Sequence, residues 1–420
     1  MLPVRVKIIL LGLFFTRKIW FDFCDDRPKL KPRIVKKIMN ALFLFVSTTI
    51  CGQSKTVTIV DSLTHKPIGL AHLSYPLLKT GSISNDDGRV KMVLQNEDLV
   101  ISHINYGDRK ISFDSFLKKD TIFLKAKNNE LDEIVLYTVD LKKKLGFVLD
   151  NYRDLYFTKS LLKECTYKES FKINDSLSRL FQIQLNWWSK HNLFNPKKPF
   201  KKENKLFIEN VDYSKVKITE NLVSKGYIEN SAFFRILQLN FLLSILKNNA
   251  DAILITSVRK NKLTTEIIFD ADYIERNKKL YSYKNSIIVF DKKSGAVNHI
   301  KLNMEYYTDF KKHESREKAL SYKSRTTFHS EELSFKKLWN GKLSLNYFIS
   351  TIKGEVKERA KKYNFAGSQK LFITKTEKKK KFKHNAIDLD KPFYESVPKS
   401  SHKNNKILLT KKEEVFVKNE

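Results

Sequence analysis

The stretch NSIIVFDKKSGAVNHIKLNM, residues 285–304, decides the fold class of this chain. Two runs rich in Ile and Val flank the turn 291–295, whose glycine permits the backbone conformation of a hairpin turn. A second hairpin is predicted at residues 251–269. Three further segments have a similar strand-like composition: residues 176–188, 344–350 and 370–374. Consecutive hairpins predict a curved antiparallel sheet, and we assign it to a larger β-rich domain at residues 141–374.

Two segments of this domain have helical rather than strand-like spacing. Leu141, Leu145 and Val148 lie three or four residues apart, which predicts a helix over residues 141–165. Residues 232–246 predict a second amphipathic helix. No apolar run in the chain reaches the roughly 18 residues that a membrane-spanning helix needs. The domain is therefore predicted to be of the α+β type, with few helices.

Residues 54–126 alternate short strands with turns. The turn signal at Asp87–Gly88 is strong, because glycine adopts a positive φ without a steric cost. Six short strands are predicted: residues 55–60, 68–75, 89–94, 99–104, 110–113 and 121–124. This spacing predicts a small Greek-key β-sandwich. The chain as a whole is thus predicted to be mainly β.

Five residues of this sandwich belong to a known pattern: Pro67, Ala71, Asp87, Gly88 and Tyr106. With their neighbours they resemble the carboxypeptidase-regulatory-like domain, a transthyretin-like β-sandwich of exported Bacteroidota proteins. The resemblance implies structural roles only: Ala71 packs inward, Gly88 makes a turn and Tyr106 caps the sandwich. It implies no peptidase activity.

The segment Leu-Asp-Glu-Ile-Val-Leu at residues 131–136, within a linker at 127–140, is similar to the sequence that usually follows this domain. In many relatives an outer-membrane transporter comes next. The chain after residue 136 is too short for a plug and a barrel of about 22 strands of about 10 residues each. The turn at 291–295 and the strand after it instead resemble the hairpins of lipoprotein-carrier-like half-barrels, which implies a curved sheet able to hold an apolar ligand.

Residues 1–53 are read as an N-terminal extension plus a signal peptide. Lys36 and Lys37 precede the apolar run 41–46, and small and polar residues follow up to Gln53. This predicts an exported protein, periplasmic or associated with the outer membrane. Cleavage there leaves Cys165 as the single cysteine, which we expect to be buried.

The formal net charge of +33 invites a nucleic-acid interpretation. Lys far outnumbers Arg, however, and Arg is the better reader of phosphates and bases. The sequence therefore favours a solvated Lys surface, and nucleic acid is disfavoured as a partner. Residues 375–420 are especially Lys-rich, and we predict a partly disordered tail there.

No sequence motif predicts a catalytic, cofactor-binding or metal-binding site. His329 and Glu332 have the His-x-x-Glu spacing of zinc carboxypeptidases, but the region is expected to be a solvated turn. Trp187 and Trp188 form a speculative ligand platform. Adjacent residues on a strand face opposite sides, so one of the two rings is expected in the core.

The sequence thus favours an exported, non-enzymatic binding or assembly module of the cell envelope. Its partner is either an unknown envelope component or an apolar ligand, with peripheral contact to the outer membrane left open. One alternative is a hydrolase of envelope polymers, which requires a cleft with converging ionisable groups. Another is polyanion binding by the basic C-terminal region.

Overall fold

The computed structural model describes most of the chain from residue 53 onward. The described ranges are 53–78, 80–103, 105–127, 139–198, 200–217, 237–249, 252–314, 321–358, 360–379, 386–389, 391, 396–397 and 407–418. The predicted signal peptide and the segment 131–136 lie outside the described residues, so both stay predictions. Residues 54–420 form one unit, distinct from residues 1–53.

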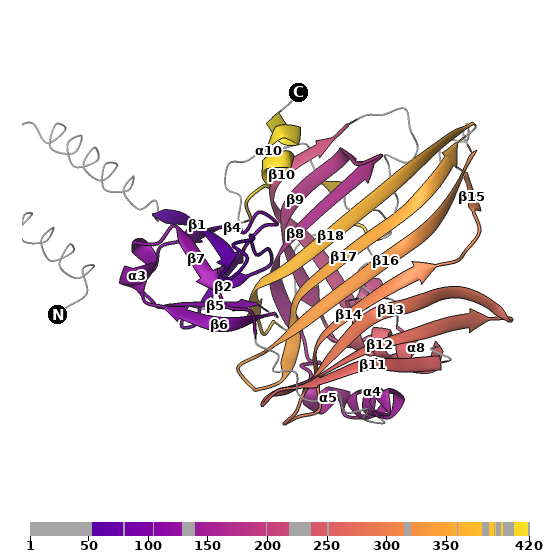
Figure 1. Ribbon diagram of the computed structural model, residues 1–420, viewed down its shortest axis with the longest axis horizontal. Coiled ribbons are helices and arrows are strands. Elements are labelled where there is room, and N and C mark those ends of the chain that lie inside the picture. The colour runs from indigo at the N-terminus through magenta and orange to yellow at the C-terminus, as the bar shows by residue number, and fades with distance from the viewer. Residues whose placement is uncertain are drawn as a thin grey trace, which may run out of the picture. The chain divides into compact units, whose positions relative to one another are not determined.

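The fold is mainly β, as predicted, and it begins with a small sandwich (Figure 1). One of its sheets has the strand order β4-β1-β7 and the other has the order β3-β2-β5-β6. Its elements are β1 (Ser54–Asp61), β2 (His72–Tyr75), β3 (Thr80–Ile83), β4 (Arg89–Val93), β5 (Leu99–His103), β6 (Tyr106–Ile111), α3 (Phe113–Leu117) and β7 (Thr121–Leu124). The two sheets share one apolar core, which includes Ile59, Leu73 and Ile101.

The sandwich differs from the prediction in three places. The strand predicted at 68–75 begins only at His72, and β3 had not been predicted at all. The strand predicted at 110–113 ends at Ile111, because Phe113 begins helix α3 and buries Phe116 against the sandwich core.

The second part is one large antiparallel sheet of eleven strands. The order is β10-β9-β8-β18-β17-β16-β14-β13-β12-β11, with β15 paired to β16. The strands are β8 (Leu161–Ile173), β9 (Ser176–Ser189), β10 (Asn204–Val216), β11 (Ala252–Lys260), β12 (Thr264–Glu275), β13 (Lys278–Asp291), β14 (Val297–Tyr306), β15 (Lys311–Glu314), β16 (Ser321–Lys337), β17 (Leu343–Glu358) and β18 (Lys361–Glu377). Both predicted hairpins are present, as β11–β12 and β13–β14.

Within the described ranges, five helices accompany this sheet: α4 (Leu141–Asp150), α5 (Tyr152–Leu155), α6 (Phe200–Glu203), α8 (Leu239–Asn249) and α10 (Lys411–Lys418). The prediction of one helix over 141–165 was wrong beyond Leu155, because the chain enters strand β8 at Leu161. The predicted tail also contains ordered structure, since β18 continues to Glu377 and α10 lies near the C-terminus.

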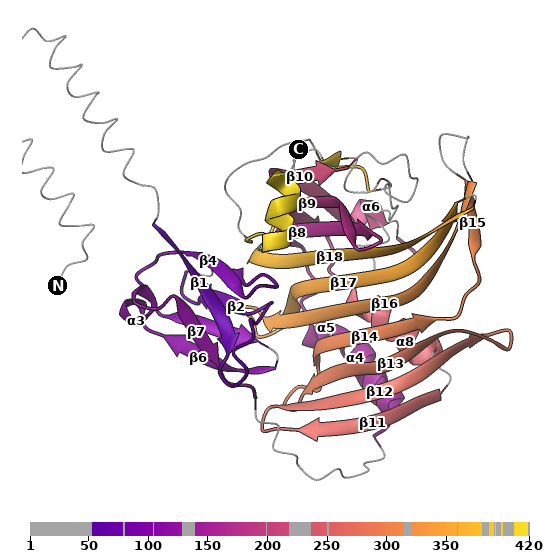
Figure 2. The same ribbon diagram turned by 45° about the horizontal axis from the view of Figure 1, so that its top comes forward.

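The sheet curves around its inner helices. One buried cluster joins Leu243 of α8 to Leu206 of β10 at one edge of the sheet and to Phe269 of β12 near the other edge. A helix layer can contact both ends of a sheet this wide only from its concave side. We therefore call the face that packs on α4, α5 and α8 the concave face (Figure 2).

The opposite, convex face contacts the sandwich. Ile83 of the sandwich packs with Tyr347 and Phe372, which alternate with concave-face residues on β17 and β18. Ile407 joins the same cluster. Residues 407–418, which we call the C-terminal strap, run from this contact to helix α10, whose Phe416 packs on β9 and β10. Among the described residues, no helix has the length and apolar character to cross a bilayer.

Candidate functional site

Three tyrosines lie side by side on the concave face. Tyr273 of β12 is opposite Tyr281 of β13, which is opposite Tyr306 of β14. The ring centroids of Tyr273 and Tyr281 are 4.7 Å apart and those of Tyr281 and Tyr306 are 5.2 Å apart. All three side chains are half-buried, and two of them border the core that the helices cover. This tyrosine strip presents apolar rings and hydroxyl groups together.

A row of polar side chains crosses four strands of the same face. Glu331 of β16 is opposite Ser350 of β17, Ser350 is opposite Gln369 of β18, and Gln369 is opposite Glu169 of β8. Residues opposite one another in antiparallel strands share a face. Leu302 lies in the core and is opposite Glu331, so this polar row faces the concave side.

One end of the polar row is a complete ion pair. Arg179 donates from Nε to Glu169 Oε1 at 2.8 Å, and its Nη2 lies 2.7 Å from the same oxygen. The Tyr167 hydroxyl donates to Glu169 Oε2 at 2.7 Å, and Gln369 Nε2 donates to that hydroxyl oxygen at 2.8 Å. Such a buried pair is stabilised by its hydrogen bonds and is costly to break.

The other end of the polar row has a histidine where the first end has an arginine. His329 Nε2 lies 3.5 Å from Glu331 Oε1 and 2.9 Å from Ser350 Oγ. Burial raises the pKa of Glu331 to about 7, because a buried carboxylate loses its hydration. Burial also lowers the pKa of His329 to about 4. The pair is therefore neutral between these two values.

The protonated Glu331 can donate a hydrogen bond as well as accept one. Tyr281 and Tyr283 of β13 and Tyr306 of β14 lie close enough for the Glu331 charge to raise their pKa values further, after burial. The cluster thus offers several neutral hydrogen-bonding groups in an apolar setting, next to the tyrosine strip.

Glu331, His329 and Ser350 do not form a catalytic triad. In a triad one imidazole nitrogen takes the serine proton while the other is held by the acid. Here Nε2 of His329 faces both Ser350 Oγ and the Glu331 carboxyl. The carboxyl therefore cannot orient the ring while Nε2 accepts a proton from the serine. The arrangement is suited to binding rather than to nucleophilic attack.

Lys163 of β8 is another buried ionisable group on the concave face. Its Nζ lies 3.9 Å from the centroid of a Trp187 ring and donates to Ser189 Oγ at 3.1 Å and to Asn192 Oδ1 at 3.0 Å. Burial lowers the pKa of Lys163 to about 7. Cys165, two residues further along the strand, is buried as predicted.

The two tryptophans face opposite sides of β9, as strand alternation requires, but neither forms an open platform. Trp187 is 1% exposed, and its Nε1 donates to Asn204 Oδ1 at 3.0 Å. Trp188 is 6% exposed and packs with Leu162 and Phe207. The predicted ligand platform is corrected accordingly: other side chains cover both rings.

The His-x-x-Glu pair also lies elsewhere than predicted. His329 and Glu332 are in the middle of strand β16, not in a solvated turn. On a strand, residues three apart face opposite sides. Glu332 accordingly accepts from the Tyr347 hydroxyl at 2.9 Å, on the convex face. Within the described part of the chain, no group of three or more His, Cys, Asp or Glu side chains could hold a metal ion.

The residues of the sandwich motif have mainly structural positions. Ala71 is fully buried in the core, and Pro67 forms an isolated antiparallel β-bridge with Val60. Gly88 has φ +73°, and a Cβ atom there would lie 2.5 Å from the carbonyl oxygen of Ile59. Tyr106 is half-buried against the core.

The turn of this motif also contacts the C-terminal strap, which the sequence had not indicated. Asp87 accepts from the backbone N–H of Lys411 at 3.0 Å. Asn85 Nδ2 donates to the Leu409 carbonyl at 3.0 Å. Lys168 of the large sheet pairs with Glu413 of the strap at 2.7 Å. The strap therefore connects the sandwich turn to the convex face through both backbone and side-chain contacts.

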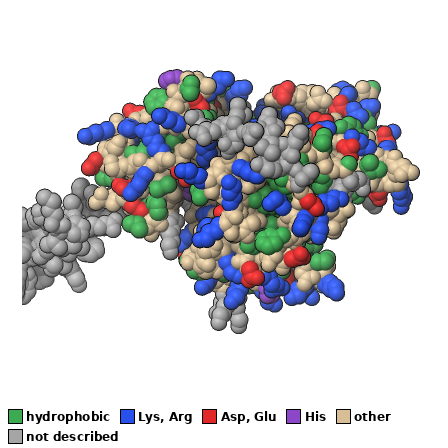
Figure 3. Space-filling model, turned by 60° about the horizontal axis from the view of Figure 1, so that its bottom comes forward, with side chains coloured by type: hydrophobic (Ala, Val, Ile, Leu, Met, Phe, Trp, Pro, Cys, Tyr) green, Lys and Arg blue, Asp and Glu red, His purple; other side chains and the backbone are tan. Residues whose placement is uncertain are grey.

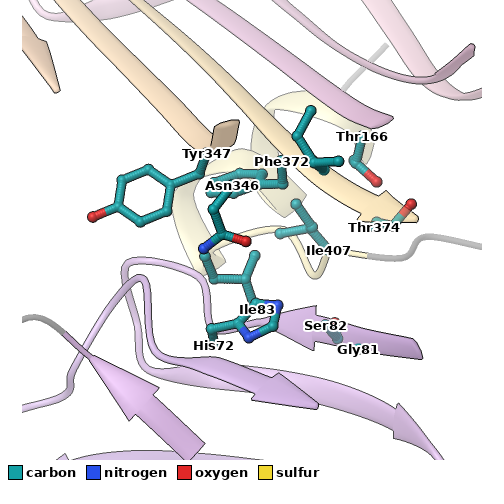
Figure 4. Close-up of a pocket in the computed structure, with 11 residues that line it drawn as sticks. His72, Gly81, Ser82, Ile83, Thr166, Asn346, Tyr347, Phe372, Thr374 and Ile407 are labelled. Atoms are coloured by element: carbon teal, nitrogen blue, oxygen red, sulfur yellow. The ribbon is translucent and has the colours of Figure 1, made fainter. Parts of the chain in front are cut away.

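A small cavity lies beneath the β2–β3 hairpin of the sandwich (Figure 4). His72 and Ile83 line it from the sandwich, Tyr347 and Phe372 from the large sheet, and Ile407 from the strap. Its volume of about 20 Å³ is enough for one water molecule, which needs roughly 10–15 Å³. We therefore regard this cavity as an interface gap rather than a ligand site.

Comparisons with known proteins do not assign a family. No family model matches the chain, and no curated protein matches it. A LolA superfamily protein from Nitrosomonas europaea is 8% identical, with a TM-score of 0.21, over 56% of this chain and 93% of its own. A DUF1329 family protein from Desulfovibrio piger is 9% identical, with a TM-score of 0.21, over 56% and 94%. Lipovitellin is 9% identical, with a TM-score of 0.23, over 55% and 27%. These similarities are too low to assign a function.

Proposed function

We propose that this chain is an exported, non-enzymatic binding protein of the cell envelope that holds an apolar ligand on the concave face of its large sheet. The observation that supports this most is the tyrosine strip, Tyr273, Tyr281 and Tyr306, half-exposed at the border of the helix-covered core. We infer that the sandwich is a carboxypeptidase-regulatory-like domain, which serves as a structural module attached to the convex face.

A ligand on the tyrosine strip would gain binding free energy by covering the apolar surface of the rings. Burying ring surface releases about 25 cal/mol for each Å² of apolar area. Tyrosine rings suit such a site, because they add contact area and can hydrogen-bond through their hydroxyl groups. Glu331 and Ser350, in the adjacent polar row, are buried and contact His329 Nε2, so hydrogen bonds to a polar group of the ligand would come from the tyrosine hydroxyls.

The hydrolase alternative rests on the same cluster and is weaker. Glu331, His329 and Ser350 do converge, as a hydrolase would require. The shared Nε2 contact and the lowered pKa of His329 leave no general base positioned for the serine. A binding role needs only hydrogen-bond donors, acceptors and apolar area, and all three are present.

Ligand binding is tested with the fluorescent apolar probe N-phenyl-1-naphthylamine and the full chain. Tyr306→Ser removes a ring from the tyrosine strip. Tyr307→Ser removes the adjacent ring, which lies just after β14 and whose hydroxyl donates to Glu305, a residue on the opposite face of the strand from Tyr306. Loss of roughly 60 Å² of ring contact costs about 1.5 kcal/mol, or about tenfold in affinity. We expect this loss for Tyr306→Ser alone. Equal affinity in all three proteins, or no probe binding, would refute the proposal.

Export is tested separately by fractionating the native host and sequencing the N-terminus of the mature protein. A mature chain that starts near Ser54 in an envelope fraction supports the proposal. Recovery of residues 1–53 on a cytosolic protein would contradict it.

A further inference from the structure

The free ends of several strands gather basic side chains at one end of the large sheet. The β12–β13 turn, β15, the start of β16 and the β17–β18 turn lie at the same end in both ribbon views (Figures 1 and 2). Exposed cationic side chains of these segments form what we call the basic rim: Arg276, Lys278, Lys311, Lys312, Lys323, Lys357, Lys361 and Lys362. These residues come from four separate segments, so folding brings together charges that are dispersed in the sequence.

Large apolar side chains lie exposed among these charges. Ile274 is 44% exposed at the end of β12, and Tyr307 is 46% exposed just after β14. Lys279 Nζ lies 5.3 Å from the ring centroid of Tyr307, so cationic and apolar groups are interleaved. Figure 3 shows a similar mixture, with Lys and Arg side chains spread over the visible face and hydrophobic side chains between them.

Acidic groups neutralise the basic rim only in part. Asp309 pairs with Lys278 at 2.6 Å, and Glu355 pairs with Lys362 at 2.8 Å and with Arg325 at 2.7 Å. Glu275 and Glu358 also lie in the rim segments. The eight cations of the rim outnumber these four carboxylates, so a positive potential remains there.

We propose that the basic rim, together with Ile274 and Tyr307, binds an anionic lipid bilayer surface. A surface of this kind combines attraction between cations and lipid headgroups with shallow burial of apolar side chains. Lysine suits a diffuse layer of headgroups, whereas base-specific or bidentate phosphate recognition favours arginine. The exposed apolar pair distinguishes a lipid surface from a soluble polyanion, which would offer nothing for these side chains to enter. This inference goes beyond the proposed ligand site and does not depend on it.

Co-sedimentation of the full chain with lipid vesicles tests the proposal. We expect binding to mixed phosphatidylcholine–phosphatidylglycerol vesicles, little binding to pure phosphatidylcholine, and weaker binding as salt is added. Each lysine near the surface contributes about fivefold in affinity. Lys311→Gln with Lys323→Gln should therefore lower the affinity by roughly 25-fold. Lys142→Gln with Lys143→Gln changes the net charge equally on the exposed side of α4 and should have little effect.

The tyrosine variants separate this proposal from the ligand site. Tyr307→Ser should weaken vesicle binding and leave probe binding intact. Tyr306→Ser should weaken probe binding and leave vesicle binding intact. Three results would overturn the inference: equal binding to neutral vesicles, equal losses in the two lysine double variants, or binding to soluble heparin that competes fully with vesicles and is insensitive to Tyr307→Ser.

Discussion

Glu331→Gln should make the protein more stable, and the gain should grow as the pH rises. Glu331 is 5% exposed, and its carboxyl has His329 beside it instead of an arginine. Burial raises its pKa from 4.5 to about 7. A glutamine of nearly the same shape keeps the contacts and cannot ionise, so it removes the cost of burying a negative charge.

The magnitude follows from the pKa difference. Between pH 4.5 and about 7 the folded protein binds the Glu331 proton and the unfolded chain does not. The contribution of this group to the free energy of unfolding therefore falls through that window and stays low above it. A pKa difference of this size between the folded and unfolded states corresponds to roughly 3 kcal/mol in the free energy of unfolding. The buried histidines act in the opposite direction at lower pH, so the difference between variant and wild type is the informative quantity.

Urea unfolding at a series of pH values measures this difference. Tryptophan fluorescence reports mainly on the large sheet, since three of the four tryptophans of the chain belong to it: Trp187 and Trp188 in β9 and Trp339 between β16 and β17. We expect a difference near zero at pH 4.5 that rises to roughly 3 kcal/mol above pH 7.

Glu169→Gln is the matched control, because Glu169 lies in the same polar row but is paired with Arg179. It should destabilise the protein by about 3–5 kcal/mol, since it leaves a buried guanidinium without its partner. A Glu331→Gln difference that is flat with pH, or a destabilisation like that of Glu169→Gln, would refute the account of Glu331.

Two further predictions concern other parts of the molecule. Burial lowers the pKa of Lys163 from 10.5 to about 7. Between these two pH values the unfolded chain binds a proton that the folded protein has released, so the free energy of unfolding should rise with pH. Lys163→Met should remove that rise when urea unfolding is measured over this range. Ending the chain at residue 406 removes the C-terminal strap and leaves the packing of Ile83 and the Asp86–Lys370 ion pair as contacts of the sandwich with the convex face. We expect these contacts to be too few to hold the sandwich, so small-angle X-ray scattering should show a larger radius of gyration that a peptide of residues 407–418 reverses.

The mainly β fold could be predicted because its strands are coded locally. Residues 285–304 contain two β-branched runs and a glycine turn, and they form β13 and β14 as expected. The helix predicted from Leu141 was correct as far as Asp150. Its first turn is capped by Asp140, whose side chain accepts from the backbone N–H of Lys143. It was wrong after Leu155 because the chain enters β8 at Leu161, and this strand is buried on both faces although polar residues such as Lys163 and Glu169 interrupt its apolar alternation.

The candidate site could not be predicted in the same way, because it depends on strand register. Tyr273, Tyr281 and Tyr306 are neighbours only because three strands pair with these residues opposite one another. Glu331 looked like part of a charged, solvated segment, and only the packing of β14 and β17 beside it shows that it is buried. Period-two alternation along β16 was the available signal, but it did not indicate which face would be covered.

The C-terminal strap determines the order in which the molecule can be assembled. Every element that residues 407–418 contact precedes them in the chain, from the sandwich turn at Asn85 to Phe372 of β18. The sandwich has its own core and can fold as soon as it has been synthesised, and Ile83 can pack on Tyr347 and Phe372 once β17 and β18 have formed. The contacts that the strap adds must wait for the strap itself. Completion of the attachment is thus a late step, and a fusion placed directly after the strap would act on that step rather than on the folding of either part.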